Sequence, residues 1–240
     1  MFRALKALPL TLALAALSLF AASCGSTSQS QIRVVDAIPD ASASLDVNIN
    51  GTKITTTALA FGAIFPSTNP PATYTKVKAG SATITAFLTG TTGNPVNTGT
   101  TTLNGSTQYT VVLNGFASND GTPGVLTDNN AAPTAGNLEF RIVDASAFTP
   151  VGGFDVYITP PSGDITGVTS QTITLGQATT YESVANASYN VVIIPHGGQI
   201  PVVNQNYPEA DGSIRTVVIV DNQGGGSGPA QFPLLFTDHN

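Results

Sequence analysis

The order of hydrophobic and polar positions predicts short β-strands along almost the whole chain. Leu45, Val47 and Ile49 alternate with polar residues, which is the period of a strand with one buried face. The same alternation returns at 82–88 and 154–158, and mainly apolar runs occupy 109–113, 189–194 and 214–220. Asn-Gly or Asp-Gly pairs, which favour tight turns, stand beside several of these segments. No helix pattern follows the first 23 residues.

The strand pattern occurs twice. Segment 32–37 (Ile-Arg-Val-Val-Asp-Ala) returns 108 residues later as 140–145 (Phe-Arg-Ile-Val-Asp-Ala), and 127–130 (Thr-Asp-Asn-Asn) returns 110 residues later as 237–240 (Thr-Asp-His-Asn). Two further segments return with offsets of 109 and 106 residues. Offsets that drift by a few residues indicate two copies of one domain with loop insertions, because solenoid units are far shorter.

Each copy, of roughly 105 residues, holds about seven short strands, which is typical of a sandwich. We therefore predict an all-β fold with two tandem immunoglobulin-like β-sandwich domains after a cleaved signal peptide. The expected boundaries are 31–130 for the first domain, 131–137 for the linker and 138–240 for the second domain. A jelly roll or a small barrel remains open at this point, because periodicity does not give strand order.

The first 23 residues read as a signal peptide. Arg3 and Lys6 precede an apolar run over 8–20, which is shorter than a comfortable membrane span. Ala21-Ala22-Ser23 stands directly before Cys24 and resembles a bacterial lipobox, in which the cysteine receives the lipid. Residues 24–30 are small and polar and read as a flexible tether. The alternative is an ordinary secretory signal that leaves a free thiol.

Cys24 is the only cysteine, so no disulfide framework can form within the chain. Lipid at Cys24 predicts attachment to a membrane of the cell envelope. Gly25 follows the cysteine where an inner-membrane lipoprotein carries Asp, which resembles outer-membrane sorting in a Gram-negative cell. We expect a membrane partner through this anchor.

The negative net charge disfavours some classes of binding partner. Without the two basic residues of the leader, six basic residues remain against 14 acidic ones, a net charge of about −8. The linear sequence shows no basic cluster, which argues against nucleic acid and against anionic lipid headgroups. No cofactor and no metal site are expected: two histidines are too few for a zinc site, and the spacing of Asp36, Asp40 and Asp46 matches no calcium loop.

Some of the few charges occupy equivalent positions in the two copies. These residues are Arg33 and Arg141, Asp36 and Asp144, and Asp46 and Asp155. Their repetition favours a structural role, as an ion pair or turn cap within each domain, because both copies must fold. The alternative is an arginine that holds a ligand through its planar fork.

The loop at 61–71 is apolar and aromatic in the first copy and polar in the second. Phe61, Ile64 and Phe65 could form a binding loop that docks a partner or a sugar. The alternative is a loop packed over the edge of its own sandwich. No nucleophile elbow of the Gly-x-Ser-x-Gly type occurs, so we expect no enzyme.

Several quoted segments together carry a family resemblance. They are the opening strand 32–37 followed by Pro39-Asp40-Ala41, the strand from Leu45 to Gly51, the segment with Tyr74, Val77 and Ala79-Gly80-Ser81, and the closing strand Tyr109 to Val112. This pattern resembles the bacterial family named domain of unknown function 4397. The second copy departs from it, with Ala187 in place of Gly80. The resemblance implies an exported, often tandem, sandwich-like module and no assigned activity.

The sequence thus predicts a lipid-anchored cell-envelope protein that serves as a non-enzymatic surface binding or scaffold module for a protein or glycan ligand. A carbohydrate-binding or adhesion protein is the alternative, and an envelope hydrolase is a third.

Overall fold

The computed structural model of the protein describes residues 28–66, 72–119, 121–208, 212–223 and 231–239. The expected signal peptide and Cys24 lie outside the described residues. Nearly all regular structure in the described chain is β-strand, with one 3-10 turn, η1 (Ala117–Asn119). This confirms the all-β, sandwich-like fold class. Among the described residues, no helix is long and apolar enough to cross a membrane.

Residues 29–127 build two sheets. One has the strand order β4-β1-β8-β9, with β5 also paired to β1, and the other has the order β3-β2-β6-β7. The strands are β1 (Gln29–Asp36), β2 (Leu45–Ile49), β3 (Thr52–Lys53), β4 (Ile64–Phe65), β5 (Thr75–Lys78), β6 (Gly80–Leu88), β7 (Asn97–Leu103), β8 (Gln108–Leu113) and β9 (Gly124–Thr127).

Residues 137–239 repeat this arrangement. Their sheets have the orders β13-β10-β16-β17 and β12-β11-β14-β15. The strands are β10 (Asn137–Asp144), β11 (Phe154–Thr159), β12 (Gln171–Ile173), β13 (Glu182–Ala185), β14 (Ser188–Pro195), β15 (Val203–Pro208), β16 (Ile214–Asp221) and β17 (Gln231–His239).

The two halves share one unusual pairing, which the sequence left open. In each half the first strand lies parallel to a strand near the end, β1 to β8 and β10 to β16, whereas all the other ladders are antiparallel. The registers also correspond, because Arg33 lies opposite Thr110 and Arg141 lies opposite Thr216. The repeat read from the sequence is therefore also a repeat of strand order and register.

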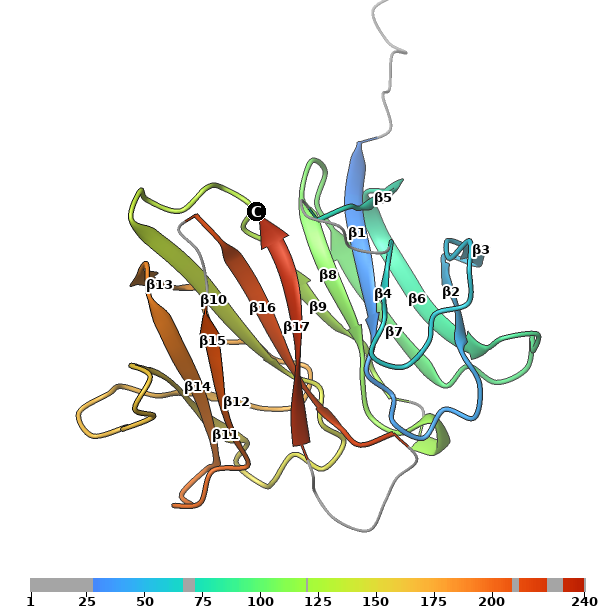
Figure 1. The fold of residues 1–240 in the computed structure, drawn as a ribbon. Coiled ribbons are helices and arrows are strands. Elements are labelled where there is room, and N and C mark those ends of the chain that lie inside the picture. Colours follow the sequence, from blue (N-terminus) through green and yellow to red (C-terminus); the bar gives the residue numbers. More distant parts are fainter. Residues whose placement is uncertain (1–27, 67–71, 120, 209–211, 224–230, 240) are drawn as a thin grey trace, which may run out of the picture.

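Three apolar layers hold the four sheets together. Each half has its own core between its two sheets, with Val34 and Val111 in the first and Ile142 and Val217 in the second. The third layer joins β1 and β8 to β10 and β16, through residues such as Val35, Val112 and Val218. The sheets that contain β1 and β10 therefore face each other, and we call them the inner sheets (Figure 1).

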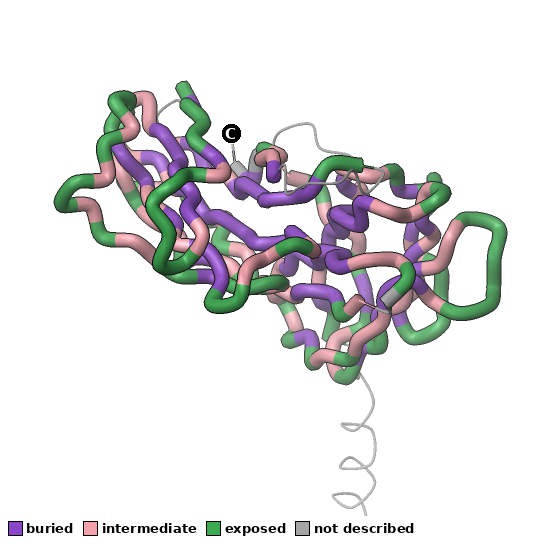
Figure 2. The backbone as a smooth tube through the Cα atoms, turned by 90° about the horizontal axis from the view of Figure 1, so that it is seen from below, coloured by how far each residue is buried: buried purple, intermediate pink, exposed green. Residues whose placement is uncertain are grey.

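The shared layer continues to the rim through aromatic pairs. Phe61 packs edge-on against Phe232 with ring centroids 6.2 Å apart, and Phe116 against Phe148 at 5.1 Å. Backbones also approach closely, since a Cβ placed on Gly124 of β9 would lie 2.7 Å from the carbonyl oxygen of Gly176. Figure 2 shows the result: buried stretches run through the middle of the molecule and exposed ones lie at the turns around it.

Candidate functional site

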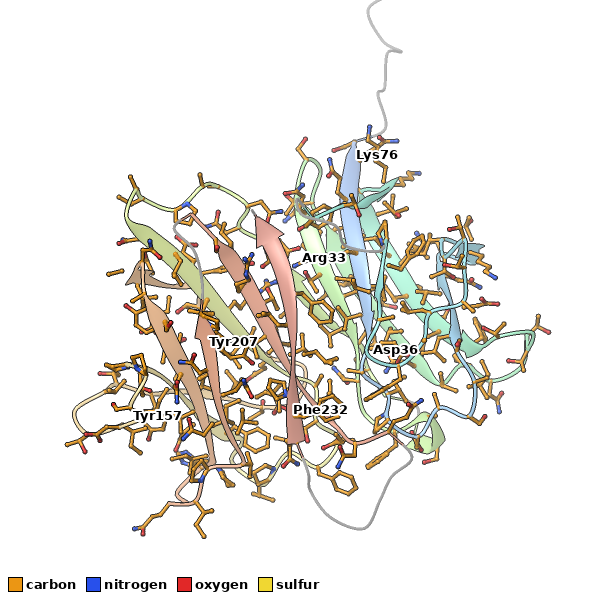
Figure 3. The ribbon with its side chains drawn as sticks, viewed as in Figure 1. Arg33, Asp36, Lys76, Tyr157, Tyr207 and Phe232 are labelled. Atoms are coloured by element: carbon orange, nitrogen blue, oxygen red, sulfur yellow. The ribbon has the colours of Figure 1, made fainter. Side chains whose placement is uncertain are left out.

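A buried group of four charges lies between the inner sheets. Arg33 of β1 and Arg141 of β10 share it with Asp128, which follows β9, and Asp238 of β17. Their side chains are between 0% and 3% exposed. We call these residues the charge quartet, and Figure 3 places Arg33 between the two halves of the molecule.

Both arginines contact both carboxylates. Arg33 binds Asp238 through Nη2 and lies 3.4 Å from Asp128 through Nε. Arg141 Nη2 lies 2.8 Å from Asp128 Oδ1 and 3.9 Å from Asp238 Oδ2. Two positive and two negative charges therefore neutralise each other, which a buried group of ions requires.

The strand period places the arginines in this layer. Side chains alternate between the faces of a strand, so Arg33 points to the same side as Val35 and Ala37, which belong to the shared layer. The parallel pairing then brings Thr110 beside Arg33, whose Nε donates to the threonine Oγ1 at 2.8 Å. Thr110 in turn donates to Asp128 at 2.8 Å.

The second copy repeats the same chain of bonds. Arg141 Nε donates to Thr216 Oγ1 at 3.2 Å, and Thr216 donates to Asp238 Oδ2 at 2.6 Å. Each arginine also lies against a tyrosine ring, Arg33 at 5.5 Å from the centroid of Tyr74 and Arg141 at 4.7 Å from that of Tyr181. Charge, hydroxyl and ring are therefore arranged alike in both halves.

Burial and the carboxylates act on Arg33 in opposite directions. Burial lowers its pKa, but the charges of Asp238 and Asp128 outweigh this and raise the pKa above its ordinary value. Burial also raises the pKa of Tyr74, whose hydroxyl donates to Asp128 at 2.8 Å. Arg33 therefore stays charged at neutral pH, and the four side chains of the quartet bind one another.

The carboxylates that we expected beside the arginines lie elsewhere. Asp36 is three residues from Arg33, and an odd separation places it on the opposite face of β1. The repeated aspartates therefore do not pair with the repeated arginines, since the same parity separates Asp144 from Arg141. Asp46 binds Lys53 at 2.8 Å, and Asp155 binds His196 at 2.9 Å.

Asp36 and Asp144 are buried instead at the ends of β1 and β10. Asp36 accepts the backbone N–H of Ile38 at 3.0 Å, and Asp144 accepts that of Ser146 at 3.0 Å. Burial raises the pKa of each carboxyl to about 7. In Asp144, hydrogen bonds from Thr149 and Ser146 partly oppose this rise. Both carboxyl groups cap turns, and the folded protein is more stable when they are protonated.

We expect Asp36→Asn to stabilise the protein at pH 8 by on the order of 2 kcal/mol. Because the folded-state pKa of about 7 lies above the ordinary 3.8, the folded protein binds more protons than the unfolded chain between these values. The contribution of Asp36 to stability is therefore present below about pH 4 and is lost as the pH rises through 7. Asparagine keeps the acceptor for Ile38 without the charge.

Chemical denaturation at pH 5 and pH 8 checks this expectation. The advantage of Asp36→Asn should shrink at pH 5, and Asp144→Asn should behave in the same way. An advantage that is absent at pH 8, or equal at both pH values, would contradict the role of the buried carboxyl.

Three apolar side chains in the described part of the loop at 61–66 take part in packing. Ile64 is 9% exposed and pairs with Val35 as part of β4. Phe61 packs in the shared layer against Phe232, and Phe65 packs against the core of the first sandwich. The packing of these three side chains favours the alternative of a packed loop over that of a binding loop. The sequence could not show this for Phe61 and Ile64, since the layer that these two fill belongs to both copies.

One exposed acid–base pair lies on the second copy. His196 Nδ1 is 2.9 Å from Asp155 Oδ1, which also accepts a hydrogen bond from Thr172 at 2.7 Å. Contact with His196 and Thr172 outweighs the effect of burial and lowers the pKa of Asp155. In the part of the chain that the structure describes, no three His, Cys, Asp or Glu side chains gather as metal ligands do.

Sequence reasoning missed half of the quartet and all of its supporting residues. Asp128 and Asp238 did carry a signal, because Thr127-Asp128 returns as Thr237-Asp238. Thr110 and Thr216 carried a second signal, because each is the polar first residue of a segment that is repeated in the two copies (110–113 and 216–219) and is otherwise apolar. A repeat shows that two positions are equivalent, but it does not show that they meet.

The comparison with protein families fits this architecture. A family model described as "Domain of unknown function (DUF4397)" matches residues 30–157. The chain belongs to this family. The match covers the whole first sandwich and continues into β11 of the second. It confirms the resemblance inferred from the sequence.

Other comparisons with this DUF4397 protein are distant. No curated protein matches it. A CBM26 module of Eubacterium rectale Amy13K, solved with maltoheptaose, is 11% identical over 87% of this chain and 96% of its own, with a TM-score of 0.26. A leucine-rich repeat protein of Bacteroides thetaiotaomicron is 13% identical over 81% and 26%, with a TM-score of 0.20. At such TM-scores neither structure informs the function.

Proposed function

We propose that this DUF4397 protein is a lipid-anchored component of the cell envelope that acts without catalysis, as a surface binding or scaffold module. The anchor is Cys24, and the expected location is the outer membrane if the cell is Gram-negative. The membrane is a direct partner, and the two sandwiches bind a protein or a glycan as their ligand.

The charge quartet is the observation that carries this proposal. Its four charges are buried and bind one another, so the most organised polar group of the described residues holds the two sandwiches together. The shared apolar layer acts in the same place. Two sandwiches fixed in this way form one stiff body, which suits a scaffold that must present a surface at a set position.

We expect Cys24→Ser to free the protein from its lipid anchor. Serine cannot form the thioether that holds the diacylglyceryl group, so the wild type alone should incorporate labelled palmitate. Ser26→Ala, two residues further on, is the matched control and should label like the wild type. Labelling of Cys24→Ser, or none of the wild type, would refute the anchor.

A groove on the second sandwich favours a glycan as the ligand. It lies between β15 and β17, has a volume of about 670 Å³, and is lined by Tyr207 and Phe232 together with Gln205 and Asn206. The exposed amide groups of Gln205 and Asn206 can form hydrogen bonds with sugar hydroxyls, and the exposed side chain of Leu235 offers an apolar surface beside them. A glycan array probed with the soluble Cys24→Ser protein tests this narrower function.

A further inference from the structure

The three lysines that follow the leader lie at one end of the first sandwich. Lys76 and Lys78 are on β5, where they pair with Gln31 and Gln29 at the beginning of β1, and Lys53 is on β3. Figure 3 shows Lys76 at the end of the molecule where β1 begins. The linear sequence shows no basic cluster, but the fold places Lys76 and Lys78 side by side with the beginning of β1. The lysines are separated in the sequence, and strand pairing brings them to the same end.

Two of these lysines are available to a ligand. Lys76 and Lys78 are exposed, and among the described residues no carboxylate lies within ion-pair distance of either. Lys53 differs, because its Nζ binds Asp46 at 2.8 Å. Arg33 and Arg141 are buried in the quartet. Lys76 and Lys78 thus place exposed positive charge at this end of a chain with a strongly negative balance.

A small hollow accompanies the two lysines. It has a volume of about 340 Å³ between β5 and the β2–β3 hairpin, and its walls include Ile49, Ile54 and Val77 beside Lys76 and Lys78. Ammonium groups at the rim of a partly apolar hollow complement a ligand that joins a phosphate to an apolar part.

The short tether limits the distance between the lipid anchor and the beginning of β1. Gln29 is five positions after Cys24, and a fully extended chain spans at most about 3.6 Å per residue, so the distance between the two residues cannot exceed roughly 18 Å. With lipid on Cys24, the start of β1 and its neighbour Lys78 are therefore held close to the membrane surface. The electrostatic attraction of that surface extends over a Debye length of about 10 Å.

We propose that Lys76 and Lys78 dock this end of the first sandwich on anionic phospholipid headgroups and so hold the anchored body in one orientation on the membrane. This inference rests on the proposed lipid anchor. The attraction of two lysines at an anionic surface corresponds to a roughly 30-fold preference for the docked orientation. The acidic remainder of the body is repelled by the same surface, which acts in the same direction.

Energy transfer from an introduced tryptophan tests the orientation, because the chain contains no tryptophan of its own. The lipidated protein is reconstituted on phosphatidylcholine vesicles, with or without phosphatidylglycerol, that carry a dansyl headgroup probe. Ser81→Trp reports on the lysine end, and Asn94→Trp reports on the opposite turn of the same sandwich. We expect transfer from Ser81→Trp to increase on anionic vesicles, to return to the neutral value in high salt, and to exceed transfer from Asn94→Trp.

The lysines are then replaced in the Ser81→Trp background. Lys76→Gln with Lys78→Gln should abolish the increase, whereas Lys53→Gln, whose ammonium is already paired, should reduce it little. Equal transfer on neutral and anionic vesicles, or an increase that survives the double replacement, would overturn the proposal.

Flotation separates this proposal from the anchor on which it rests. Lipidated protein should float with neutral vesicles whether or not the lysines are present, and failure to float refutes the anchor alone. Docking is then measured with the Cys24→Ser protein on anionic vesicles at low salt. Binding that the double lysine replacement weakens about 30-fold would support docking, and binding that it leaves unchanged would refute it.

Discussion

Replacing Arg33 with methionine is expected to lower the free energy of unfolding by about 3–5 kcal/mol. The substitution leaves the buried carboxylate of Asp238 without its closest cation, and Arg141 is 3.9 Å away from it. Methionine fills much of the volume, so the loss reports mainly the unpaired charge. Because Arg33 contacts aspartates at the ends of both copies, guanidinium denaturation should show destabilisation of both sandwiches.

A paired replacement is the control for this prediction. Arg33→Met combined with Asp238→Leu removes both partners and should recover most of the lost stability, because an apolar pair can replace a buried ion pair at little cost. If Arg33→Met unfolds at the same denaturant concentration as the wild type, the arginine is not structural. The alternative that it holds a ligand would then be favoured.

Replacing Val112 with aspartate is expected to separate the two sandwiches without unfolding them. Val111 and Val112 are neighbours in β8, and both are 0% exposed. They point to opposite faces, so Val111 belongs to the core of the first sandwich and Val112 to the shared layer. An ionised carboxylate in that layer costs several kcal/mol, and separation exposes it to water.

Substitution of the adjacent residue, Val111, is the control for this prediction. Val111→Asp should unfold the first sandwich, whereas Val112→Asp should keep β-type circular dichroism and give a larger radius of gyration in X-ray scattering. A Val112→Asp protein with the dimensions and stability of the wild type would show that the shared layer does not hold the halves together.

Much of the fold could be predicted from the sequence, because period and repetition are local properties. The alternation at Leu45 to Ile49 predicted the one-sided strand β2, and Asn50-Gly51 predicted the turn after it, where both residues have positive φ. The adjacent apolar pairs Val34-Val35 and Val111-Val112 carried a further signal that we did not use. A strand that is apolar on both faces is covered on both faces.

The candidate site was harder to predict, because it depends on contacts between the copies. The parity of Arg33 and Asp36 already excluded a shared face, but no pattern in the chain showed that Asp238 would complete the quartet across the other copy. The lysine end depended in the same way on β5 returning beside β1. Local sequence predicts which face a residue occupies, whereas its partner depends on the layer that covers that face.

Each arginine of the quartet makes its shortest contact with the aspartate of the other copy, Arg33 with Asp238 and Arg141 with Asp128. Reciprocal contacts of this kind are typical of an isologous interface, in which the same patch on two subunits contacts itself across a two-fold axis. The halves of this chain thus meet as the subunits of a homodimer do. A protein with a single copy and the same Arg, Thr and Asp would leave this face uncovered, and two such chains would bury it by dimerising. Joining the copies by a short linker makes that association intramolecular, so that the paired body forms at any dilution.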